Sequence, residues 1–429
     1  MNSHTRNALG GTLVLGGGFA GGYVARRIGR SGATIVNPAN YMLYTPLLPE
    51  AAAGTIEPRH VTVPLRTMAP HADLLLGSAV AIDPERRAVQ VESEAGSFTV
   101  EYEDLVVALG AVTRIPNVPG LREHALGVKD VADAIRLRNQ VLRQIELADA
   151  DPDSAERRLT FLFAGAGFAG VETIAELQEL AAFALRRHPR LAGVEPRWLL
   201  VDPAERILGQ TPEGLAHFAE RTLTNRGIEI LGGTALASVD GGGAVLSDGR
   251  RVDSDTVVWT AGVAANPLVA KLGLPVDDRG RVQVDETLQV VGMPGVWSLG
   301  DCAAVPNEAT GELDPPTCQH ALRQARRLAR NLRGTPRAYA YKTRGQMATL
   351  GRRHGIAVLG RVHVRGALGW AVARGYHLVQ LPFTSRRIRV MADWLAAACF
   401  RRDVSELSLP TDPREAPTDV DDRSVLSFA

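Results

Sequence analysis

The chain of 429 residues has only three cysteines, Cys302, Cys318 and Cys399, and no two of them lie a few residues apart. A disulfide framework, a zinc cluster or a redox-active disulfide relay needs cysteines in closely spaced pairs. The sequence therefore argues against all three. We expect a protein of a reducing compartment, and we expect no metal site.

Long apolar runs are also missing from the sequence. No window reaches about 18 uninterrupted apolar residues, so we expect no membrane-spanning helix. Residues 1–10 lack a charged stretch followed by an apolar one, so we expect no signal peptide and a cytoplasmic protein. The formal net charge is only +1, which gives no indication of nucleic-acid binding.

Glycine, in contrast, is abundant, with 43 residues, and two segments of the chain share one layout. Each segment predicts a strand, a glycine-rich turn, a helix and a second strand, which together form a βαβ unit. The predicted elements are residues 12–15, 21–29 and 33–36 in the first unit, and 159–164, 171–187 and 198–201 in the second. We expect an α/β fold with two Rossmann-like dinucleotide-binding domains and a C-terminal helical or α+β extension.

Both predicted turns carry the glycine spacing of a phosphate cradle. The glycines are Gly16, Gly18 and Gly21 in the first turn, and Gly165, Gly167 and Gly170 in the second. Such glycines allow a tight turn, a close approach of the backbone to a pyrophosphate, and tight packing of helix on strand. One motif alone could be a simple turn, but two in the same frame indicate two dinucleotides, a bound flavin and an exchanging nicotinamide.

The residue after each second strand normally contacts a ribose. Asp202 occupies this position in the second unit, where a carboxylate would accept from a 2′-hydroxyl and repel a 2′-phosphate. We therefore expect NADH rather than NADPH, with a strand-end turn residue as the alternative reading. In the first unit the position holds Asn37, which can still hydrogen-bond a ribose but lacks the charge.

Further strands and helices complete the predicted domain plan. Residues 98–109, 256–260 and 295–299 predict strands, 130–146 predict a helix, and 149–154 predict a polar linker. The expected divisions are 1–115 for the first part of the FAD-binding domain, 116–264 for the NADH-binding domain, 265–335 for the second FAD-binding part, 336–402 for a C-terminal domain, and 403–429 for a loose acidic tail.

With these motifs in place, the chain resembles the pyridine-nucleotide flavoproteins and, within them, the type II NADH dehydrogenases. The resemblance runs from about residue 11 to about residue 400. It is carried by Asn40-Tyr41 with Pro46-Leu47-Leu48, by Val107-Ala108-Leu109-Gly110-Ala111, by Val258-Trp259-Thr260-Ala261-Gly262, by Ser298-Leu299-Gly300-Asp301-Cys302, and by Pro315-Pro316-Thr317-Cys318-Gln319. It implies FAD as the bound cofactor and NADH as the co-substrate.

The resemblance also implies roles for individual residues. Asp301 would contact the ribityl chain of the flavin, Gln319 would line the acceptor pocket, and Glu172 would handle a proton or position the nicotinamide. The FAD candidates are Gly16, Gly18, Phe19, Ala20, Gly21, Asn37, Val80, Gly110, Asp301, Cys318 and Gln319. The NADH candidates are Gly165, Gly167, Gly170, Glu172, Asp202 and Gly262.

Alternatives stay open for several of these side chains. Glu172 could instead be a solvated acid in the first turn of a helix, favoured by the helix dipole. We expect Glu176, one helical turn further on, to be structural. Cys318 could be reactive near the flavin, but an inert thiol fits better. His320 could bond a quinone carbonyl or be a partly exposed helix residue.

The resemblance implies that NADH electrons pass to a quinone without a thiol relay. The alternative is a soluble FAD/NADH oxidoreductase that reduces another small molecule or a protein. We also expect a homodimer.

The C-terminal region predicts two amphipathic helices separated by Pro382. One apolar face contains Leu368, Ala371, Val372, Gly375, Tyr376 and Val379, and the other contains Ile388, Met391, Trp394, Leu395, Ala398 and Cys399. The flanking arginines favour attachment to an anionic membrane surface, on the inner face of the cell membrane. Alternatively, both faces could pack on the flavin domain or on a dimer partner.

Overall fold

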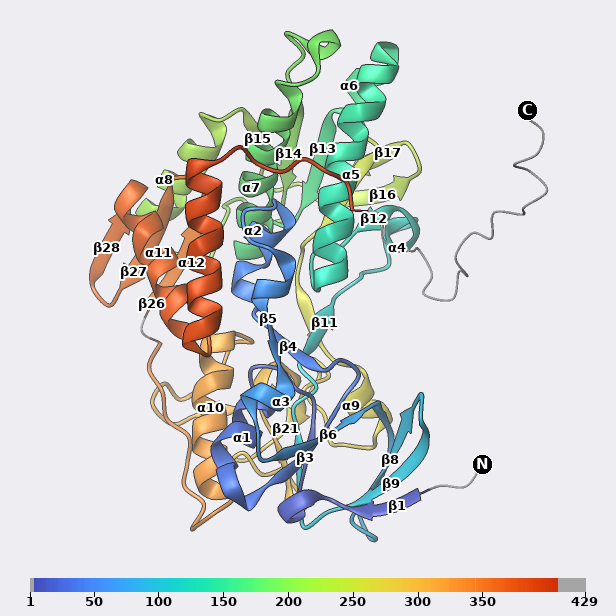
Figure 1. The fold of residues 1–429 in the computed structure, drawn as a ribbon, viewed down its shortest axis with the longest axis vertical. Coiled ribbons are helices and arrows are strands. Elements are labelled where there is room, and N and C mark those ends of the chain that lie inside the picture. The colour runs from blue at the N-terminus through green and yellow to red at the C-terminus, as the bar shows by residue number, and fades with distance from the viewer. Residues whose placement is uncertain (1–3, 344, 408–429) are drawn as a thin grey trace, which may run out of the picture.

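Two parallel β-sheets lie towards opposite ends of an elongated molecule, and the C-terminal elements run along one side (Figure 1). This arrangement is seen in a computed structural model that describes residues 4–343 and 345–407. The central strands of both sheets are fully buried, because helices and loops cover both faces. The predicted α/β fold with two Rossmann-like units is confirmed.

The first sheet has the strand order β22-β10-β2-β3-β6, and all of its neighbouring pairs are parallel. Its strands are β2 (Thr12–Leu15), β3 (Ala33–Asn37), β6 (Ala72–Leu76), β10 (Asp104–Val107) and β22 (Val296–Ser298). Two helices far apart in the chain, α1 (Gly21–Ile28) and α10 (Cys318–Asn331), pack against each other beside it. The chain therefore leaves this sheet after β10 and returns to it at β22.

The second sheet repeats this plan with the order β12-β19-β13-β14-β15, again all parallel. Its strands are β12 (Ala125–Leu126), β13 (Thr160–Ala164), β14 (Arg197–Val201), β15 (Ile228–Leu231) and β19 (Thr256–Trp259). Its helices are α5 (Val131–Ala150), α7 (Phe168–Leu185) and α8 (Glu213–Thr224). Asp130 and Asp133 form a capping box that fixes the start of α5.

A narrow antiparallel ribbon joins the two sheets. The chain passes from the first sheet to the second through β11 (Ala111–Thr113) and returns through β20 (Val263–Ala265), and these two strands pair with each other between the sheets (Figure 1). Two antiparallel meanders flank the sheets. The first consists of β7 (Ser78–Asp83), β8 (Ala88–Ser93) and β9 (Gly96–Glu101), and β1 (His4–Asn7) joins it parallel to β9. The second consists of β16 (Leu236–Asp240), β17 (Gly243–Leu246) and β18 (Arg251–Asp253).

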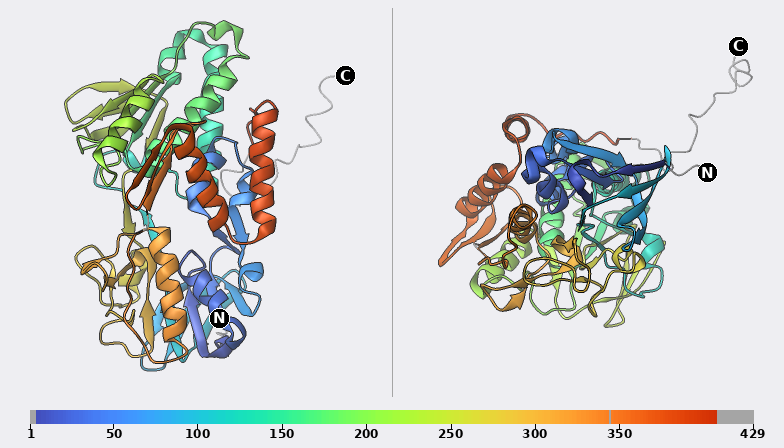
Figure 2. Two further views of the ribbon diagram at one scale, coloured as in Figure 1. Left: turned by 90° about the vertical axis from the view of Figure 1, so that its left-hand side faces the viewer. Right: turned by 90° about the horizontal axis from the view of Figure 1, so that it is seen from below.

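The C-terminal region forms an antiparallel sheet followed by two helices. The strands are β26 (Gly345–Thr349), β27 (Gly355–Leu359) and β28 (Val362–Arg365). Helix α11 (Gly366–Gln380) packs on this sheet, and α12 (Thr384–Cys399) stands beside it on the outside of the molecule (Figure 2). No helix in the described ranges is long and apolar enough to cross a lipid bilayer.

Three details of the predicted layout are wrong. Helix α5 continues beyond its predicted end at residue 146 to Ala150, because Ala148 is still buried, and Pro152 then ends it. Short helices follow at Pro152–Ser154 and Ala155–Arg158, so residues 149–154 are not a linker. Helix α7 begins at Phe168, inside the glycine motif and earlier than the predicted start at residue 171.

The start of the predicted loose tail is anchored. The side chain of Arg138 on α5 donates to the carbonyl oxygens of Asp403 and Ser405, and Asn139 exchanges hydrogen bonds with Leu407. Residues 403–407 therefore bind along α5. The remainder of the predicted tail, 408–429, lies outside the described residues.

Candidate active site at two dinucleotide cradles

The first glycine turn leads from β2 into α1. A Cβ atom on Gly21 would lie 2.0 Å from the carbonyl oxygen of Gly16, so only glycine lets the helix approach the turn this closely. A Cβ on Gly18 would meet no atom within 4 Å. The protein itself therefore leaves space at the middle glycine, where a pyrophosphate would approach the backbone.

The second turn, between β13 and α7, has the same geometry. A Cβ on Gly170 would lie 1.8 Å from the carbonyl oxygen of Gly165, and a Cβ on Gly167 would meet nothing within 4 Å. Gly167 has φ −75° and is the N-cap of α7, so the first amides of a long helix lie at this turn. Both turns fit the diphosphate of a dinucleotide.

Asn37 and Asp202 occupy equivalent positions in the two units. The side-chain oxygen of Asn37 accepts a hydrogen bond from the amide of Gly17 at 2.8 Å, and Asp202 accepts from the amide of Ala166 at 2.7 Å. The asparagine therefore makes the same contact with its glycine turn that the aspartate makes. Asp202 also accepts from the amide of Ala204 at 2.8 Å, and its carboxylate keeps further lone pairs for a ribose.

Two more glycine candidates mark a matching place in each sheet. Gly110 follows β10 with φ +68°, and Gly262 follows β19 with φ +81°. A Cβ on either of them would meet nothing within 4 Å. Each glycine thus lies in an open loop just beyond the carboxyl end of a strand that neighbours the glycine-turn strand of its own sheet, β2 or β13. Ligands of α/β sheets bind at this edge.

The remaining FAD candidates of the first unit lie in different surroundings. Ala20 is buried at the start of α1, and Phe19 packs its ring 5.5 Å from that of Tyr44. Val80 is 46% exposed and sits at a bulge of β7. Ala20 and Phe19 are thus close to the first cradle, whereas Val80 belongs to the flanking meander.

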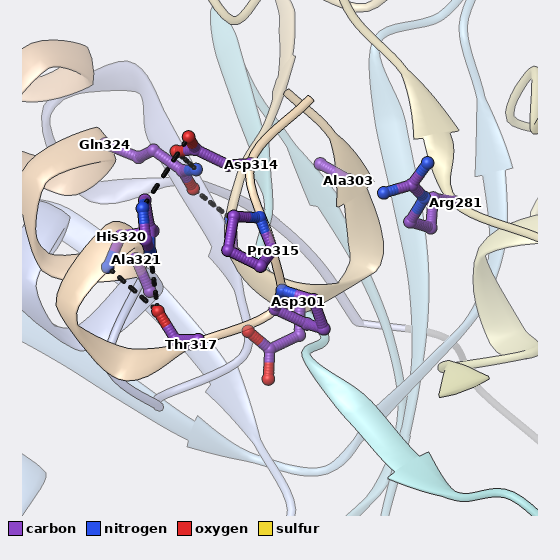
Figure 3. A pocket seen from close by; sticks show the side chains of 11 residues that line it. Arg281, Asp301, Ala303, Asp314, Pro315, Thr317, His320, Ala321 and Gln324 are labelled. Atoms are coloured by element: carbon purple, nitrogen blue, oxygen red, sulfur yellow. Dashed lines mark hydrogen bonds and ion pairs between the residues drawn. The ribbon is translucent and has the colours of Figure 1, made fainter. Parts of the chain in front are cut away.

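Asp301 lies in a short 3-10 helix, Gly300–Cys302, directly after β22. Burial raises the pKa of its carboxyl group, and the positive charge of Lys129 opposes this effect. Within the part of the chain that the structure describes, its carboxylate accepts no hydrogen bond. In Figure 3 this carboxylate lies apart from the dashed network of its neighbours. It is therefore free to accept from hydroxyl groups of a ligand.

A buried polar network holds this loop against α10 (Figure 3). Gln324 accepts from the amide of Gly300 at 2.8 Å and donates to Asp314 at 2.8 Å. The His320 ring is buried, and its two nitrogens pair with the hydroxyls of Thr317 at 2.6 Å and Thr343 at 3.2 Å. The prediction of a partly exposed residue is therefore wrong, and both ring nitrogens of His320 have partners within the fold.

Gln319 and Cys318 occupy the first turn of α10. The Gln319 amide donates to the carbonyl oxygen of Gly345 at 3.3 Å and accepts from the hydroxyl of Tyr341 at 3.2 Å. Burial and the nearby Asp301 carboxylate raise the pKa of the Cys318 thiol to about 11. At neutral pH this thiol is protonated, which agrees with the expected inert cysteine.

Glu172 lies in the second turn of α7 and contacts the C-terminal sheet. Thr349, the last residue of β26, donates to its carboxylate from the backbone amide at 2.9 Å and from the hydroxyl at 3.3 Å. Burial raises the pKa of Glu172 to about 8, despite these hydrogen bonds. The alternative of a solvated acid in the first helical turn is wrong.

A buried acid near Glu172 was not predicted from the sequence. Glu50, in α2 (Leu48–Ala52), is buried and pairs with Arg374 of α11 at 2.9 Å and with the indole nitrogen of Trp394 of α12 at 2.6 Å. Burial raises its pKa. The available signal was a single acid within an otherwise apolar stretch, because such a residue must find buried partners.

A second missed group lies where α11 contacts Tyr44. His377 accepts or donates at its Nδ1 to the Tyr44 hydroxyl at 3.5 Å, and burial lowers the pKa of His377 to about 4. Its imidazole is therefore neutral at physiological pH. Arg374 and His377 belong to the same helix as the predicted apolar face, but both side chains find partners in the interior, Glu50 and Tyr44.

The structure pairs no cysteines. Cys302 is buried, Cys318 is partly buried and Cys399 is exposed, and all three are free. A thiol relay is thus not available to this site within residues 4–343 and 345–407, in agreement with the spacing of the cysteines.

These features define an α/β oxidoreductase with one dinucleotide site on each of two parallel sheets. Residues 11–325 match the model of the pyridine nucleotide-disulphide oxidoreductase family, and the chain belongs to this family. Within it, the chain is a member of the type II NADH dehydrogenase kind, as the resemblance implied.

Curated relatives and solved structures agree with this assignment. The chain is 30% identical to a type II NADH:quinone oxidoreductase of Mycobacterium tuberculosis, over 89% of this chain and 86% of the relative. It is 29% identical to a probable NADH dehydrogenase of Dictyostelium discoideum, over 87% and 85% of the two chains. The NDH2 structure from Plasmodium falciparum has the same fold, with a TM-score of 0.86, 17% identity, and coverage of 94% and 100%.

Proposed function

We propose that this protein is an NADH:quinone oxidoreductase that uses FAD as its bound cofactor. The overall reaction converts NADH, a proton and a quinone into NAD⁺ and a quinol. When bound, FAD supplies the chemistry that accepts a hydride and passes two electrons on. The names of the curated relatives, which include NADH:quinone oxidoreductases and a demethylphylloquinone reductase, support a quinone as the acceptor.

The observation that carries this proposal is the way β26 links the two candidate catalytic residues. Gln319 contacts Gly345 at one end of this strand, and Glu172 contacts Thr349 at the other end. Four residue steps of extended chain separate the contacts by roughly 13 Å. The two side chains can therefore act at different places on the bound flavin, one for each half-reaction.

Each residue then has a distinct task. The Gln319 amide orients the acceptor from the start of α10, while Glu172 holds a proton on its carboxyl group, as its pKa of about 8 allows. Asp202 selects NADH by accepting from the ribose, and Asp301 accepts from the flavin's hydroxyl chain. We propose the domain division 1–115 with 265–335 for FAD, 116–264 for NADH, and 336–402 for the C-terminal domain.

Purification and a steady-state assay test this proposal. The protein should be yellow, with about one non-covalent FAD per chain, and should oxidise NADH with short-chain quinones as acceptors. A colourless protein that fails to bind added FAD would contradict the cofactor assignment. Rapid reduction of other acceptors with no turnover of any quinone would favour the alternative, an oxidoreductase with a different acceptor.

We further propose that the protein attaches to the inner face of the cell membrane through α11 and α12. Large apolar side chains on these helices and at the end of α12 are exposed by 45–75%; they are Leu368, Val379, Ile388, Met391, Leu395 and Phe400. Arginines flank them, at Arg386, Arg387, Arg389 and Arg401. Apolar burial and attraction to anionic lipid together favour such a surface over water.

Co-sedimentation with vesicles tests this attachment. Wild-type protein should bind anionic vesicles at low salt and be released at high salt. Leu368→Ser with Leu395→Ser should weaken binding, whereas Val194→Ser, at another exposed apolar residue, should not. Wild-type protein that stays in the supernatant at low salt would contradict the attachment. In that case, sedimentation would show whether this face pairs two copies in the expected homodimer.

A further inference from the structure

Five arginines follow one another along a single face of helix α10. They recur every three or four positions, which places them on one stripe of the helix. They are Arg323, Arg326, Arg327, Arg330 and, just past the end of α10, Arg333. This stripe is about 15 Å long at the rise of an α-helix. Neither α10 nor α1, which packs against it, contains an acidic residue.

The end of helix α1 adds three more arginines beside this stripe. Arg26 and Arg27 lie in the last turn of α1, and Arg30 follows shortly after it. Burial lowers the pKa of Arg27, and the positive charges of Arg326 and Arg330 lower it further, so the two groups of arginines are neighbours. The arginines within residues 26–30 and 323–333 are together called the arginine patch.

No carboxylate is paired with this patch in the part of the chain that the structure describes. Arg26 and Arg323 lie instead over the rings of Phe383 and Tyr341, at 5.0 and 5.2 Å. The exposed members of the patch are Arg26, Arg30, Arg326, Arg330 and Arg333. The whole chain has 48 basic and 47 acidic residues, so the patch is a local excess of positive charge. Such an excess attracts a polyanion.

The arginine patch is continuous with the start of helix α12. Arg26 contacts Phe383, the residue directly before this helix. Burial raises the pKa of the Tyr23 hydroxyl on α1, and the positive charges of Arg26 and, from α12, Arg387 oppose this effect. The left view of Figure 2 shows α10 below α11 and α12 on the same side of the molecule. The patch therefore borders the exposed apolar side chains of these two helices.

We propose that the arginine patch binds the head groups of anionic phospholipids at a membrane surface, beside the apolar side chains of α11 and α12. An exposed apolar surface flanked by positive charge is complementary to an anionic bilayer, whereas an acidic protein or a nucleic acid would match the charge alone. This inference rests on the proposed attachment through α11 and α12 and extends it to the FAD-binding unit.

The same stripe of α10 begins at the candidate acceptor residue. Gln319 lies four positions before Arg323, so the two share one face of the helix. With the patch bound to lipid, α10 lies along the membrane surface and its first turn is held close to the bilayer. A quinone with an apolar side chain dissolves in the bilayer, because its apolar surface is then removed from water. The contact therefore shortens the path of such an acceptor to Gln319.

A triple substitution in the stripe tests this contact. Arg326→Gln, Arg330→Gln and Arg333→Gln remove three exposed charges that have no ion-pair partner among the described residues, so thermal unfolding should be unchanged. The measurement is co-sedimentation at low salt with vesicles of phosphatidylglycerol and phosphatidylcholine. The affinity of the triple variant should fall by at least about tenfold, because each arginine near an anionic surface strengthens binding severalfold.

A matched control removes the same charge elsewhere. Arg86, Arg122 and Arg279 are exposed, lie outside the patch and form no ion pair within the described ranges. The combination of Arg86→Gln, Arg122→Gln and Arg279→Gln should therefore bind these vesicles as wild type does. Equal affinity of the two triple variants would overturn the proposal, because the position of the charges would then have no effect.

A fluorescent label tests direct contact with lipid. In a Cys399→Ser background, Arg330→Cys provides an exposed thiol within the patch, and Arg86→Cys provides one outside it. An environment-sensitive dye at position 330 should shift its emission to shorter wavelengths on anionic vesicles, and the same dye at position 86 should not. The absence of a shift at position 330, with the protein bound to the vesicles, would overturn the contact.

Turnover of NADH with a soluble short-chain quinone, measured without vesicles, separates this inference from the proposed function. Turnover should be the same in wild type and in both triple variants. Vesicle binding that survives the substitutions in the stripe would overturn the patch and assign the attachment to α11 and α12 alone, with the reaction intact. Wild-type protein that binds polyglutamate but not anionic vesicles would overturn the lipid assignment in favour of an acidic protein.

Discussion

The two βαβ units have the same backbone plan but differ in charge and in helix length. In both, a residue at the end of the second strand accepts from an amide of the glycine turn, Asn37 from Gly17 and Asp202 from Ala166. The first unit does this with a neutral amide and continues into a helix of 8 residues. The second does it with a carboxylate and continues into a helix of 18 residues that carries Glu172 inward.

The difference in charge between Asn37 and Asp202 corresponds to the difference between binding a cofactor and selecting a nucleotide. The position after the second strand supports the turn in either unit, since amide and carboxylate oxygens both accept. A negative charge adds discrimination against a 2′-phosphate, which is useful where a soluble nucleotide must be selected at each turnover. The helix of the second unit also carries the acid Glu172, which contacts Thr349.

The largest effects are expected from one substitution made in both units. Ala at Gly18 or Gly167 meets no protein atom and would obstruct only a pyrophosphate. Gly18→Ala should yield protein with little FAD. Gly167→Ala should remain yellow, with KM for NADH raised by about 100-fold, or ~2.7 kcal/mol. Flavin absorbance and steady-state kinetics measure both, and loss of FAD from Gly167→Ala would reverse the assignment of the two cradles.

The next prediction makes the second unit resemble the first. Asp202→Asn preserves an oxygen for the amide of Ala166 and removes the negative charge. The preference for NADH over NADPH, measured as a ratio of kcat/KM values, should fall by about tenfold, or ~1.4 kcal/mol. Asn37→Asp is the matched control and should leave that ratio unchanged. An unaltered ratio in Asp202→Asn would remove the residue from the specificity site.

The acid that only the second unit carries should produce a pH dependence. The pKa of Glu172, about 8, is above its usual value of 4.5, so the carboxyl group keeps its proton below pH 8 and ionises above it. The rate of the NADH half-reaction in stopped flow should therefore change between pH 7 and 9 in wild type. It should be flat there in Glu172→Gln. Identical profiles would show that Glu172 does not act in this step.

The same residue links pH to folding. A raised pKa favours the protonated form in the folded state, so this group's contribution to the free energy of unfolding falls as pH rises from about 4.5 to about 8. The decline in thermal stability over that range should be smaller in Glu172→Gln. A decline equal to that of wild type would contradict the raised pKa.

The smallest effect concerns the acceptor side. Gln319→Ala removes hydrogen bonds with Gly345 and Tyr341, worth about 1 kcal/mol. Flavin re-oxidation by quinone should slow by about fivefold, with NADH reduction nearly intact. Tyr341→Phe is the control, because it removes only the Tyr341 contact and keeps both the Gln319 side chain and its contact with Gly345 of β26. A slower NADH half-reaction in Gln319→Ala would contradict the assignment of Gln319 to the acceptor half-reaction.

The parts of the fold that follow from local pattern could be predicted from the sequence. The strands at 12–15 and 198–201, both glycine turns, and the two C-terminal helices appear where the periodicity put them. These elements depend on glycine geometry and on apolar spacing within one segment, and both are visible in a single sequence.

Contacts between distant segments could not be predicted in the same way. The pairing of Glu50 with Arg374, 324 positions apart, and the contact of Glu172 with Thr349 depend on how the C-terminal sheet packs on α7. A lone acid in an apolar stretch shows that some partner exists, but not which one. His320 was misread because its partners Thr317 and Thr343 are joined only by the fold.

The strand β26 contacts both candidate catalytic residues, Gln319 and Glu172. A displacement of this strand alters the Gln319 contact and the Glu172 contact together, since Gly345 and Thr349 belong to the same five residues. In the proposed reaction, a quinone that displaces Gln319 would therefore also change the contact of Glu172. By linkage, the nicotinamide nucleotide changes the affinity for the quinone by the same factor that the quinone changes the affinity for the nucleotide.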